Sequence, residues 1–384
     1  MKLGFFLRRK EIYIENFIRY SLLLIDYLLW LFLSPSKFSG LPKLKRVLVI
    51  DTGGLGDCLN TYCIIQKLRQ DYKKISFYYA TNKKFQEAIK HFDDKLVDYD
   101  DKGNLSQNDF DMVISVVHKR INIRRIKTKF IIGMETEGFS SVFKFDSFLM
   151  ARRIFPKYQH KIIERFKIFE KAGFKFRDYN LIFPEIKENK LPAIKLAKSL
   201  SLSQDDKIAF VNISSGTSTK AKKENKVPSH DWPIEYYKEL VNRLLEDKKI
   251  KVIITGMKDE EKESSAILSS AKDRKRVFSI IGKLSFLELG EFMKSFKSAI
   301  LVSIDTGTIH LATSFNIPVI DLIGPYDPKL YCAWNPSSNK AISLFNPGDC
   351  SKCRKYACPE GNNICMRNIS AEEVYEIYKE MADD

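Results

Sequence analysis

The feature that most constrains the fold is a pair of consecutive series in which short apolar runs alternate with helical patterns. The first series predicts strands at 46–50 (RVLVI), 75–81 (ISFYYAT) and 110–117 (FDMVISVV), with helices at 58–72 and 83–92. Strands and helices that alternate in this way form a parallel sheet with helices on both faces.

The second series follows a polar, lysine-rich stretch from Glu185 to Lys198. It predicts strands at 207–214, 251–257, 277–282, 298–305 and 317–324, with helices at 233–247 and 285–296. The two series predict an α/β protein with two Rossmann-like domains that face a cleft, where ligands bind beyond the carboxyl ends of the strands. We place these domains at residues 43–190 and 191–384, after an N-terminal extension of residues 1–42.

The extension contains the apolar segment 12–33 (IYIENFIRYSLLLIDYLLWLFL), which Glu15, Arg19 and Asp26 interrupt. Its uninterrupted apolar part is short for a bilayer span, which needs about 20 residues. Basic residues on both sides favour an amphipathic helix on an anionic membrane surface. The alternatives are a helix packed on the protein itself and a true span.

The net charge limits the kinds of binding partner, and the cysteine content indicates the cellular compartment. The 64 basic and 48 acidic residues give a net charge of +16, which favours anionic partners. Nucleic acid is disfavoured, because aromatic residues do not interleave a basic patch. Few cysteines and no evident cleavable secretory signal predict a cytosolic location.

A glycine turn follows the first predicted strand, in the stretch VLVIDTGGLGD. Gly53, Gly54 and Gly56 match neither the dinucleotide fingerprint nor a P-loop, so a dehydrogenase or P-loop ATPase is disfavoured. The glycines allow a sharp bend and a close approach to a ligand. Asp57 is placed either to cap the next helix or to take a proton from a bound hydroxyl group.

A second turn follows a strand in the stretch SIDTGTIHLA. Asp305, Thr306 and Gly307 open a predicted helix, whose N-terminal N–H groups and dipole attract an anionic diphosphate. His310 on the first turn either adds a hydrogen bond to that group or is a satisfied core residue. Ser214 and Ser215, where the strand in FVNISSGT ends, also suit phosphate oxygens.

Taken together and in this order, the motifs resemble glycosyltransferase family 9, the lipopolysaccharide heptosyltransferases. The resemblance covers roughly residues 46–378 and includes VLVIDTGGLGD, FVNISSGT, DWPIEYYKEL, VIITGMKDEE, SIDTGTIHLA and IGPYDP. It implies a GT-B architecture, with the acceptor held mainly by the first domain and the nucleotide-sugar mainly by the second. It also implies inverting transfer without a metal, typically from ADP-heptose.

The resemblance also implies roles for single residues. Asp57 matches the family's proposed general base, and Glu260 matches a glutamate near the nucleoside, although exposed helix capping is an alternative role for it. Asp305 shapes the second turn, and the positions used around the phosphates match Ser214, Ser215, Thr306, Gly307 and His310.

Two positions depart from the family pattern. His230 stands where relatives commonly carry a lysine that can contact the diphosphate, so either His230 acts as a weaker, pH-dependent donor or a nearby lysine reaches in, from Lys222, Lys223 or Lys226. Tyr326 changes the family's GPT to GPY. The N-terminal extension is absent from typical members of the family. This difference and Tyr326 leave the donor and the acceptor less defined than the fold.

Four cysteines near the C-terminus, Cys350, Cys353, Cys358 and Cys365, are candidates for a structural zinc site, a disulfide or redox pair, or unligated packing thiols. No catalytic metal is implied. We predict a glycosyltransferase at the cytoplasmic face of the membrane, peripherally associated, that acts on a lipid-linked saccharide. The alternative is a non-catalytic, membrane-bound nucleotide-sugar-binding protein.

Overall fold

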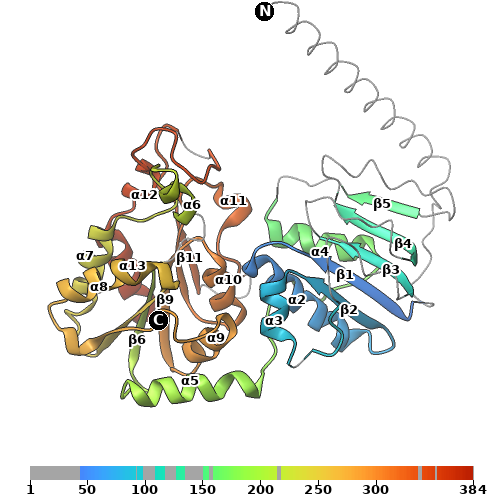
Figure 1. Ribbon diagram of the computed structural model, residues 1–384, viewed down its shortest axis with the longest axis horizontal. Helices are drawn as coiled ribbons and strands as arrows, with labels where there is room; N and C mark the ends of the chain where they lie inside the picture. Colours follow the sequence, from blue (N-terminus) through green and yellow to red (C-terminus); the bar gives the residue numbers. More distant parts are fainter. Residues whose placement is uncertain are drawn as a thin grey trace, which may run out of the picture.

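The computed structural model describes residues 44–91, 93–97, 109–116, 127–134, 150–154, 159–213, 218–335, 340–350 and 353–383. The predicted extension of residues 1–42 lies outside this part of the chain. Figure 1 shows two α/β bodies side by side. We call them the N-terminal domain and the C-terminal domain. Within the described part, no helix combines the length and the apolar character that a membrane crossing requires.

The N-terminal domain holds a five-stranded parallel sheet of order β2-β1-β3-β4-β5. Its central strand β1 is almost entirely apolar, and Val47 to Ile50 are fully buried because helices cover both faces of the sheet. The strands are β1 (Arg46–Asp51), β2 (Ser76–Thr81), β3 (Asp109–Ser115), β4 (Lys127–Met134) and β5 (Met150–Ile154), and the helices are α2 (Leu55–Asp71), α3 (Lys83–Ile89) and α4 (Lys161–Lys171).

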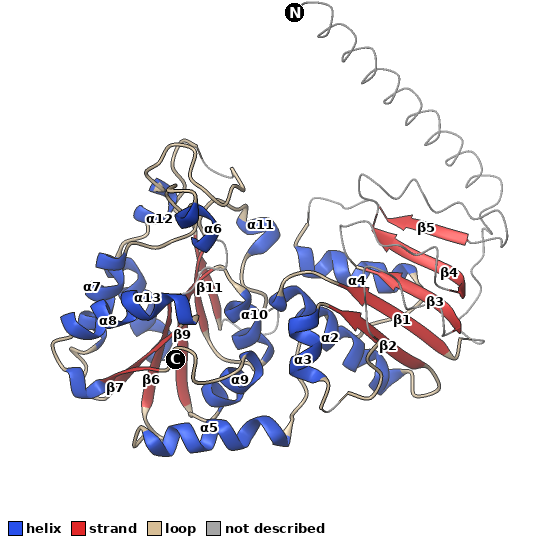
Figure 2. Cartoon of the chain, viewed as in Figure 1, coloured by secondary structure: helices blue, strands red, loops and turns tan. Residues whose placement is uncertain are grey.

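The C-terminal domain holds a six-stranded parallel sheet of order β11-β10-β9-β6-β7-β8 (Figure 2). Its strands are β6 (Lys207–Asn212), β7 (Ile250–Thr255), β8 (Val277–Ser279), β9 (Ser298–Ile304), β10 (Val319–Leu322) and β11 (Ala341–Leu344). Its helices are α5 (Lys187–Ser199), α6 (Ser218–Lys223), α7 (Ile234–Leu244), η4 (Lys258–Glu260), α8 (Glu261–Ser270), η5 (Arg274–Arg276), α9 (Phe286–Lys294), α10 (Gly307–Ser314), α11 (Pro328–Tyr331), α12 (Ile364–Arg367) and α13 (Ala371–Asp383).

The predicted fold class is confirmed, since both series form parallel sheets covered by helices. Several elements differ from the prediction. The strand predicted at 277–282 stops at Ser279, and Gly282 then turns the chain with a φ of 67°. The stretch taken as a polar boundary forms α5, which contains Pro192 and packs against α9. The predicted domain boundary at 190/191 therefore falls inside a helix.

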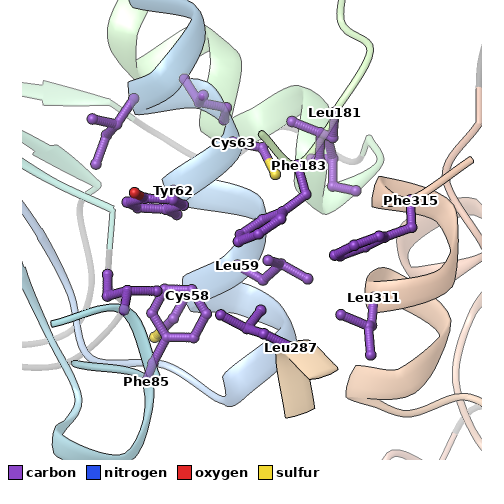
Figure 3. Packing of buried hydrophobic residues seen from close by; sticks show 14 of the residues in the cluster. Cys58, Leu59, Tyr62, Cys63, Phe85, Leu181, Phe183, Leu287, Leu311 and Phe315 are labelled. Atoms are coloured by element: carbon purple, nitrogen blue, oxygen red, sulfur yellow. The ribbon is translucent and has the colours of Figure 1, made fainter. Parts of the chain in front are cut away.

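The two domains are joined by an apolar cluster, shown in Figure 3. Phe183, in the segment between α4 and α5, lies between Tyr62 of α2 and Phe315 at the end of α10. Its ring centroid is 5.9 Å from that of Tyr62 and 5.1 Å from that of Phe315, on which it stacks. Leu59 of α2 and Leu311 of α10 are fully buried in the same cluster. This packing sets the N-terminal turns of α2 and α10 opposite each other.

Candidate active site

Asp57 lies in the first turn of α2, just beyond the carboxyl end of β1. Its Oδ2 accepts a hydrogen bond from the Gly54 N–H, 3.3 Å away, which confirms the predicted capping role. Its Oδ1 lies 2.7 Å from Nη2 of Arg165. The Asp57 side chain is still 47% exposed, and each carboxylate oxygen can accept two hydrogen bonds. Capping therefore leaves the carboxylate accessible to a ligand.

The charge state of Asp57 is set by opposing effects. Burial acts to raise the pKa of Asp57, but the Arg165 guanidinium lowers it, and the resulting pKa lies below the ordinary value of 3.8. The carboxylate is thus ionised throughout the neutral range, as a group that accepts a proton must be.

Arg165 is the main site residue that sequence analysis missed. It extends from α4, and its Nη2 also lies 3.6 Å from Oδ2 of Asp51, a fully buried carboxyl group. Its Nε donates to Oγ1 of Thr61 over 3.3 Å, and that hydroxyl donates to Asp51 Oδ2 over 2.6 Å. Burial acts to lower the pKa of Arg165, but Asp57 and Asp51 raise it above its ordinary value, so the guanidinium stays charged. The sequence signal that could have found it is its spacing: Arg165 lies three residues after the buried Ile162, and so on the same face of the helix.

The two predicted turns meet between the domains. A Cβ atom on Gly56 would lie 2.5 Å from Cδ2 of His310, closer than real Cβ contacts, and 3.0 Å from the Gly307 Cα, which is also tight. A Cβ atom on Gly307 would lie 3.3 Å from the Gly56 nitrogen. Asp57 and His310, which are far apart in sequence, therefore belong to one site.

The contacts of the first glycine turn show why glycine stands there. Gly54 has a φ of −65°, and the glycines with positive φ in the described part of the chain are elsewhere. A Cβ atom on Gly53 would lie 2.9 Å from the Cβ of Asp57. The turn thus needs glycine for close approach, and a left-handed backbone plays no part.

His310 extends from the first turn of α10 towards Gly56. Its Nδ1 is buried and has no hydrogen-bond partner among the residues that the structure describes. Burial lowers the pKa of His310, so its ring is neutral at pH 7. Buried polar atoms in native proteins are usually hydrogen-bonded. The free nitrogen therefore favours a ligand contact over the satisfied core role.

Polar side chains form a row across the second sheet, close to the carboxyl ends of its strands. They occupy paired positions on neighbouring strands: Thr255, Asn212, Ser303, Asp321 and Ser343. Thr255 Oγ1 donates to Asn212 Oδ1 over 3.2 Å, Asn212 Nδ2 donates to Ser303 Oγ over 2.9 Å, and Ser343 Oγ donates to Asp321 Oδ2 over 3.0 Å. Sequence analysis did not identify this row.

The row supports the second turn. Asn212 Nδ2 lies 3.4 Å from Oγ1 of Thr306, the N-cap residue of α10. Burial, and then the charge of Asp57, raises the pKa of Asp305 to about 7. Burial and Asp305 raise the pKa of Asp321 well above its ordinary value. The surroundings of both acidic groups therefore favour their neutral forms, which lowers the cost of placing an anion beside them.

Comparison with known proteins identifies the chain. The family model described as "Glycosyltransferase family 9 (heptosyltransferase)" matches residues 102–364, more than half of the 384 residues. The chain belongs to glycosyltransferase family 9. This confirms the resemblance found in the sequence.

Relatives and solved structures extend this result. Lipopolysaccharide heptosyltransferase 2 of Escherichia coli K12 is 24% identical over 151 residues, which cover 39% of this chain and 42% of that protein. The match thus spans less than half of that curated relative. A family 9 glycosyltransferase from Veillonella parvula has a TM-score of 0.70 at 20% identity, covering 88% of this chain and 97% of its own. E. coli heptosyltransferase WaaC with ADP-2-deoxy-2-fluoro heptose has a TM-score of 0.59 at 19% identity, covering 87% and 99%. At these identities the two structures support the GT-B fold.

The two departures from the family 9 pattern contact each other. His230 is 5% exposed, and its ring centroid lies 4.8 Å from that of Tyr326. Burial lowers the pKa of His230 to about 4, so the ring carries no positive charge at pH 7. Lys222 Nζ lies 3.1 Å from Glu263, and Lys226 is ion-paired as well. A cationic His230 is thus disfavoured, and contact of Lys222, Lys223 or Lys226 with a diphosphate stays a prediction.

Glu260 caps η4 from a buried position. It is 6% exposed, and its Oε2 accepts a hydrogen bond from the Met257 N–H over 2.8 Å. The predicted capping is therefore confirmed, but its exposure was wrong. A Cβ atom on Gly256 would lie 2.8 Å from Glu260 Oε2, so the glutamate is packed directly against the end of β7. Its contact with a nucleoside stays a prediction.

The remaining predicted residues divide into two groups. Ser214 and Ser215 lie outside the described residues. The four C-terminal cysteines are free thiols, and across the described residues no three His, Cys, Asp or Glu side chains are arranged to hold a metal ion. A structural zinc site or a redox pair at Cys350, Cys353, Cys358 and Cys365 stays a prediction. Cys365 is buried in the core of the C-terminal domain, which supports a packing role for it.

Proposed function

We propose that this chain is an inverting glycosyltransferase that transfers a sugar, heptose from ADP-heptose, to the lipopolysaccharide core or a related lipid-linked saccharide. One observation carries the proposal. The ionised Asp57 of the N-terminal domain lies beside His310 and Gly307 of the C-terminal domain, where the two sheets direct their carboxyl ends. A base and an anion-binding turn therefore lie side by side between the domains, where ligands of such folds bind.

The reaction would use Asp57 as the general base. The acceptor hydroxyl oxygen attacks the anomeric carbon, and the bond from that carbon to the diphosphate oxygen breaks on the opposite face. The proton of the hydroxyl passes to Asp57, whose partial exposure admits the acceptor. Arg165 holds one carboxylate oxygen in place over 2.7 Å. Because attack and departure occur on opposite faces, the configuration at the anomeric carbon inverts.

The departing diphosphate would be held by the start of α10. Thr306 is the N-cap residue and Gly307 is the first helical residue, so unpaired N–H groups and the helix dipole face the ligand. The neutral His310 can add one hydrogen bond through its free nitrogen. These fixed donors would stabilise the negative charge that develops as the bond breaks.

The donor and acceptor assignments have different support. E. coli heptosyltransferase WaaC, solved with ADP-2-deoxy-2-fluoro heptose, shares this fold. The net charge of +16 suits a phosphorylated, lipid-anchored acceptor at an anionic membrane. We infer that the protein works at the inner face of the cell membrane, associated with it peripherally.

The proposal is tested by measuring sugar transfer from a panel of nucleotide sugars that includes ADP-heptose, with truncated lipopolysaccharide as acceptor. We expect transfer from one donor and inversion at the anomeric carbon, which NMR of the product reports. Tight donor binding without transfer to any acceptor in a membrane lipid extract would instead favour the non-catalytic nucleotide-sugar binder.

Donor affinity should depend on pH through Asp305. Because its pKa is about 7, the group is neutral below that pH and negative above it. An anionic donor then binds more weakly as the pH rises, by at most about tenfold per pH unit. Isothermal titration calorimetry with ADP-heptose, whose diphosphate does not titrate between pH 6 and 9, measures this. The Asp305→Asn variant should show a nearly constant affinity, and a constant wild-type affinity would contradict the prediction.

Membrane association should depend on the extension. Deletion of residues 1–40 is expected to abolish flotation with anionic liposomes and to leave donor binding in solution unchanged, since the donor site lies in the C-terminal domain. Neutral liposomes serve as the control, because electrostatic attraction to them is absent. If the truncated protein still floats with anionic liposomes, the extension is not the anchor.

A further inference from the structure

Residues 332–334, which follow α11, contact the N-terminal domain and the segment after it; we call them the interdomain strap. His160 Nε2 lies 2.9 Å from the carbonyl oxygen of Cys332. The Trp334 ring stacks on the His160 ring, with centroids 4.5 Å apart and an interplanar angle of 27°. The Trp334 indole Nε1–H donates to the Tyr179 carbonyl oxygen over 2.9 Å. Two adjoining hydrogen bonds and a ring stack thus cross between the domains.

The strap is fixed equally firmly to the second sheet. The Ala333 N–H lies 3.0 Å from Asp321 Oδ2 and 3.1 Å from Ser343 Oγ, both of which belong to the polar row. Ala333 is buried, and Asp321 is fully buried. The strap therefore cannot move away from the C-terminal domain without breaking a buried hydrogen bond, which is costly.

His160 uses both ring nitrogens in this connection. It is the N-cap residue of α4, where its Nδ1 accepts a hydrogen bond from the Ile162 N–H over 3.2 Å. Its Nε2–H is then the donor to Cys332, so a single neutral tautomer satisfies both contacts. Burial is the main cause that lowers the pKa of His160 to about 4; the hydrogen bond to Cys332 opposes the shift, and the charges of Arg165 and Lys161 add to it. The ring is therefore neutral at pH 7.

The helix that His160 caps also carries Arg165. From its position in the second turn of α4, Arg165 reaches Asp57 Oδ1 over 2.7 Å. The contacts therefore run without interruption from Asp321 through the strap, His160 and α4 to the proposed base. If the strap moves His160, α4 moves with it, and the Arg165 guanidinium is then displaced from the Asp57 carboxylate that it orients.

We propose that His160 is a positioning residue, which joins the strap of the C-terminal domain to the first turn of α4 and so holds Arg165 against Asp57. The catalytic effect of positioning Arg165 rests on the proposed function. The connection between the strap and α4 through His160 does not. Neither ring nitrogen of His160 needs to touch a substrate for this role.

The link is tested first by hydrogen exchange, without any activity measurement. His160→Phe keeps the ring stacked on Trp334 but removes both hydrogen bonds. We expect peptides covering 160–170 and 328–335 to exchange faster together, by roughly fivefold, the change that the loss of one capping bond produces. Acceleration confined to 160–170 would overturn the proposal, because His160 would then be a local cap only.

A matched pair of tryptophan variants separates the strap from general loss of packing. Trp334→Phe removes an indole hydrogen bond that reaches Tyr179, whereas Trp232→Phe removes a 2.8 Å indole bond to the Ile369 carbonyl within the C-terminal domain. We expect only Trp334→Phe to accelerate exchange in 160–170. Equal acceleration by both variants, or by neither, would contradict the strap.

Kinetics then test the positioning role. His160→Phe should lower kcat by about 10- to 100-fold, because small displacements of catalytic groups cost rates of this size, while the donor KM changes little. The acidic limb of the pH–rate profile should move to higher pH as Asp57 loses its ion pair. If His160→Phe lowers the Tm but leaves kcat and the acidic limb of the pH–rate profile unchanged, the role of His160 is structural only. If the wild-type protein transfers no sugar, the proposed function fails, and the exchange experiment still decides the link.

Discussion

Replacement of Asp57 by alanine is expected to lower the rate of sugar transfer by ~10²–10⁴-fold, the usual contribution of a general base. Donor binding should persist, because the groups assigned to the diphosphate lie on α10 of the C-terminal domain. The measurement compares transfer rates under saturating donor with donor affinity from calorimetry. Asp57→Asn, which keeps the size of the side chain, should lose activity to a similar extent, because an amide cannot take up the proton.

The capping role of Asp57 supplies the matched control. Glu288 accepts a hydrogen bond from the Ser285 N–H over 2.7 Å at the start of α9, as Asp57 does from Gly54 at the start of α2. Glu288→Ala therefore removes a comparable cap and should reduce stability by about 1 kcal/mol while transfer continues. If Asp57→Ala retains the transfer rate of Glu288→Ala, the carboxylate is a cap and another group is the base.

Replacement of Arg165 by glutamine should lower the free energy of unfolding by about 3–5 kcal/mol at pH 7, the cost of leaving a buried charge without its partner. The Arg165 side chain is 9% exposed, and it faces the fully buried Asp51 as well as Asp57. Urea unfolding followed by circular dichroism measures the loss.

The stability lost in the Arg165→Gln variant should depend on pH. In the wild-type protein the pKa of Asp57 is lowered, mainly by Arg165 acting against burial, so its contribution to stability is present above the unfolded value of 3.8 and is lost as the pH falls through the folded pKa. The variant lacks this contribution, and the difference in stability between the two proteins should therefore narrow below about pH 4. A difference that is independent of pH would mean that lost packing, and not lost charge, destabilises the variant.

Two further variants separate charge from packing. Asp51→Asn in the Arg165→Gln background removes one of the carboxylates left without a cation, and we expect it to recover part of the lost stability. Arg69→Gln breaks a 2.7 Å ion pair with the buried Asp93, at the opposite end of α2 from Asp57. It should cost stability but leave the acidic limb of the pH–rate profile in place.

Sequence patterns predicted the fold well where strands are covered on both faces. The run Val47 to Ile50 and the strands β6, β7 and β9 are almost wholly apolar, because neither face of these central strands meets water. The strands β4, β5 and β11 were not predicted, and the last two are edge strands. β5 reads MARRI and β11 has only four residues, so neither shows an apolar run that distinguishes it from a loop. α5 contains Pro192, which opposes a helix prediction.

The candidate site was predicted in part. Asp57, Gly56, Gly307 and His310 were identified from two turns, and the structure brings those turns into contact. For Glu260, the capping role was predicted, but its burial was not. Arg165 was missed because a lone arginine in a helical pattern resembles a solvated side chain, and only its place beside buried Ile162 and Phe166 marks it as internal.

The sequence by itself determined the two parallel sheets and the turns at the carboxyl ends of β1 and β9, because strand burial and turn chemistry are local properties of the chain. Only the tertiary structure decided which distant side chains meet: Arg165 reaches Asp57 across 108 residues, and His160 reaches Cys332 across 172. It also decided the protonation states of Asp57, Asp305 and His160, since a pKa depends on the burial and the charges that folding places around a group.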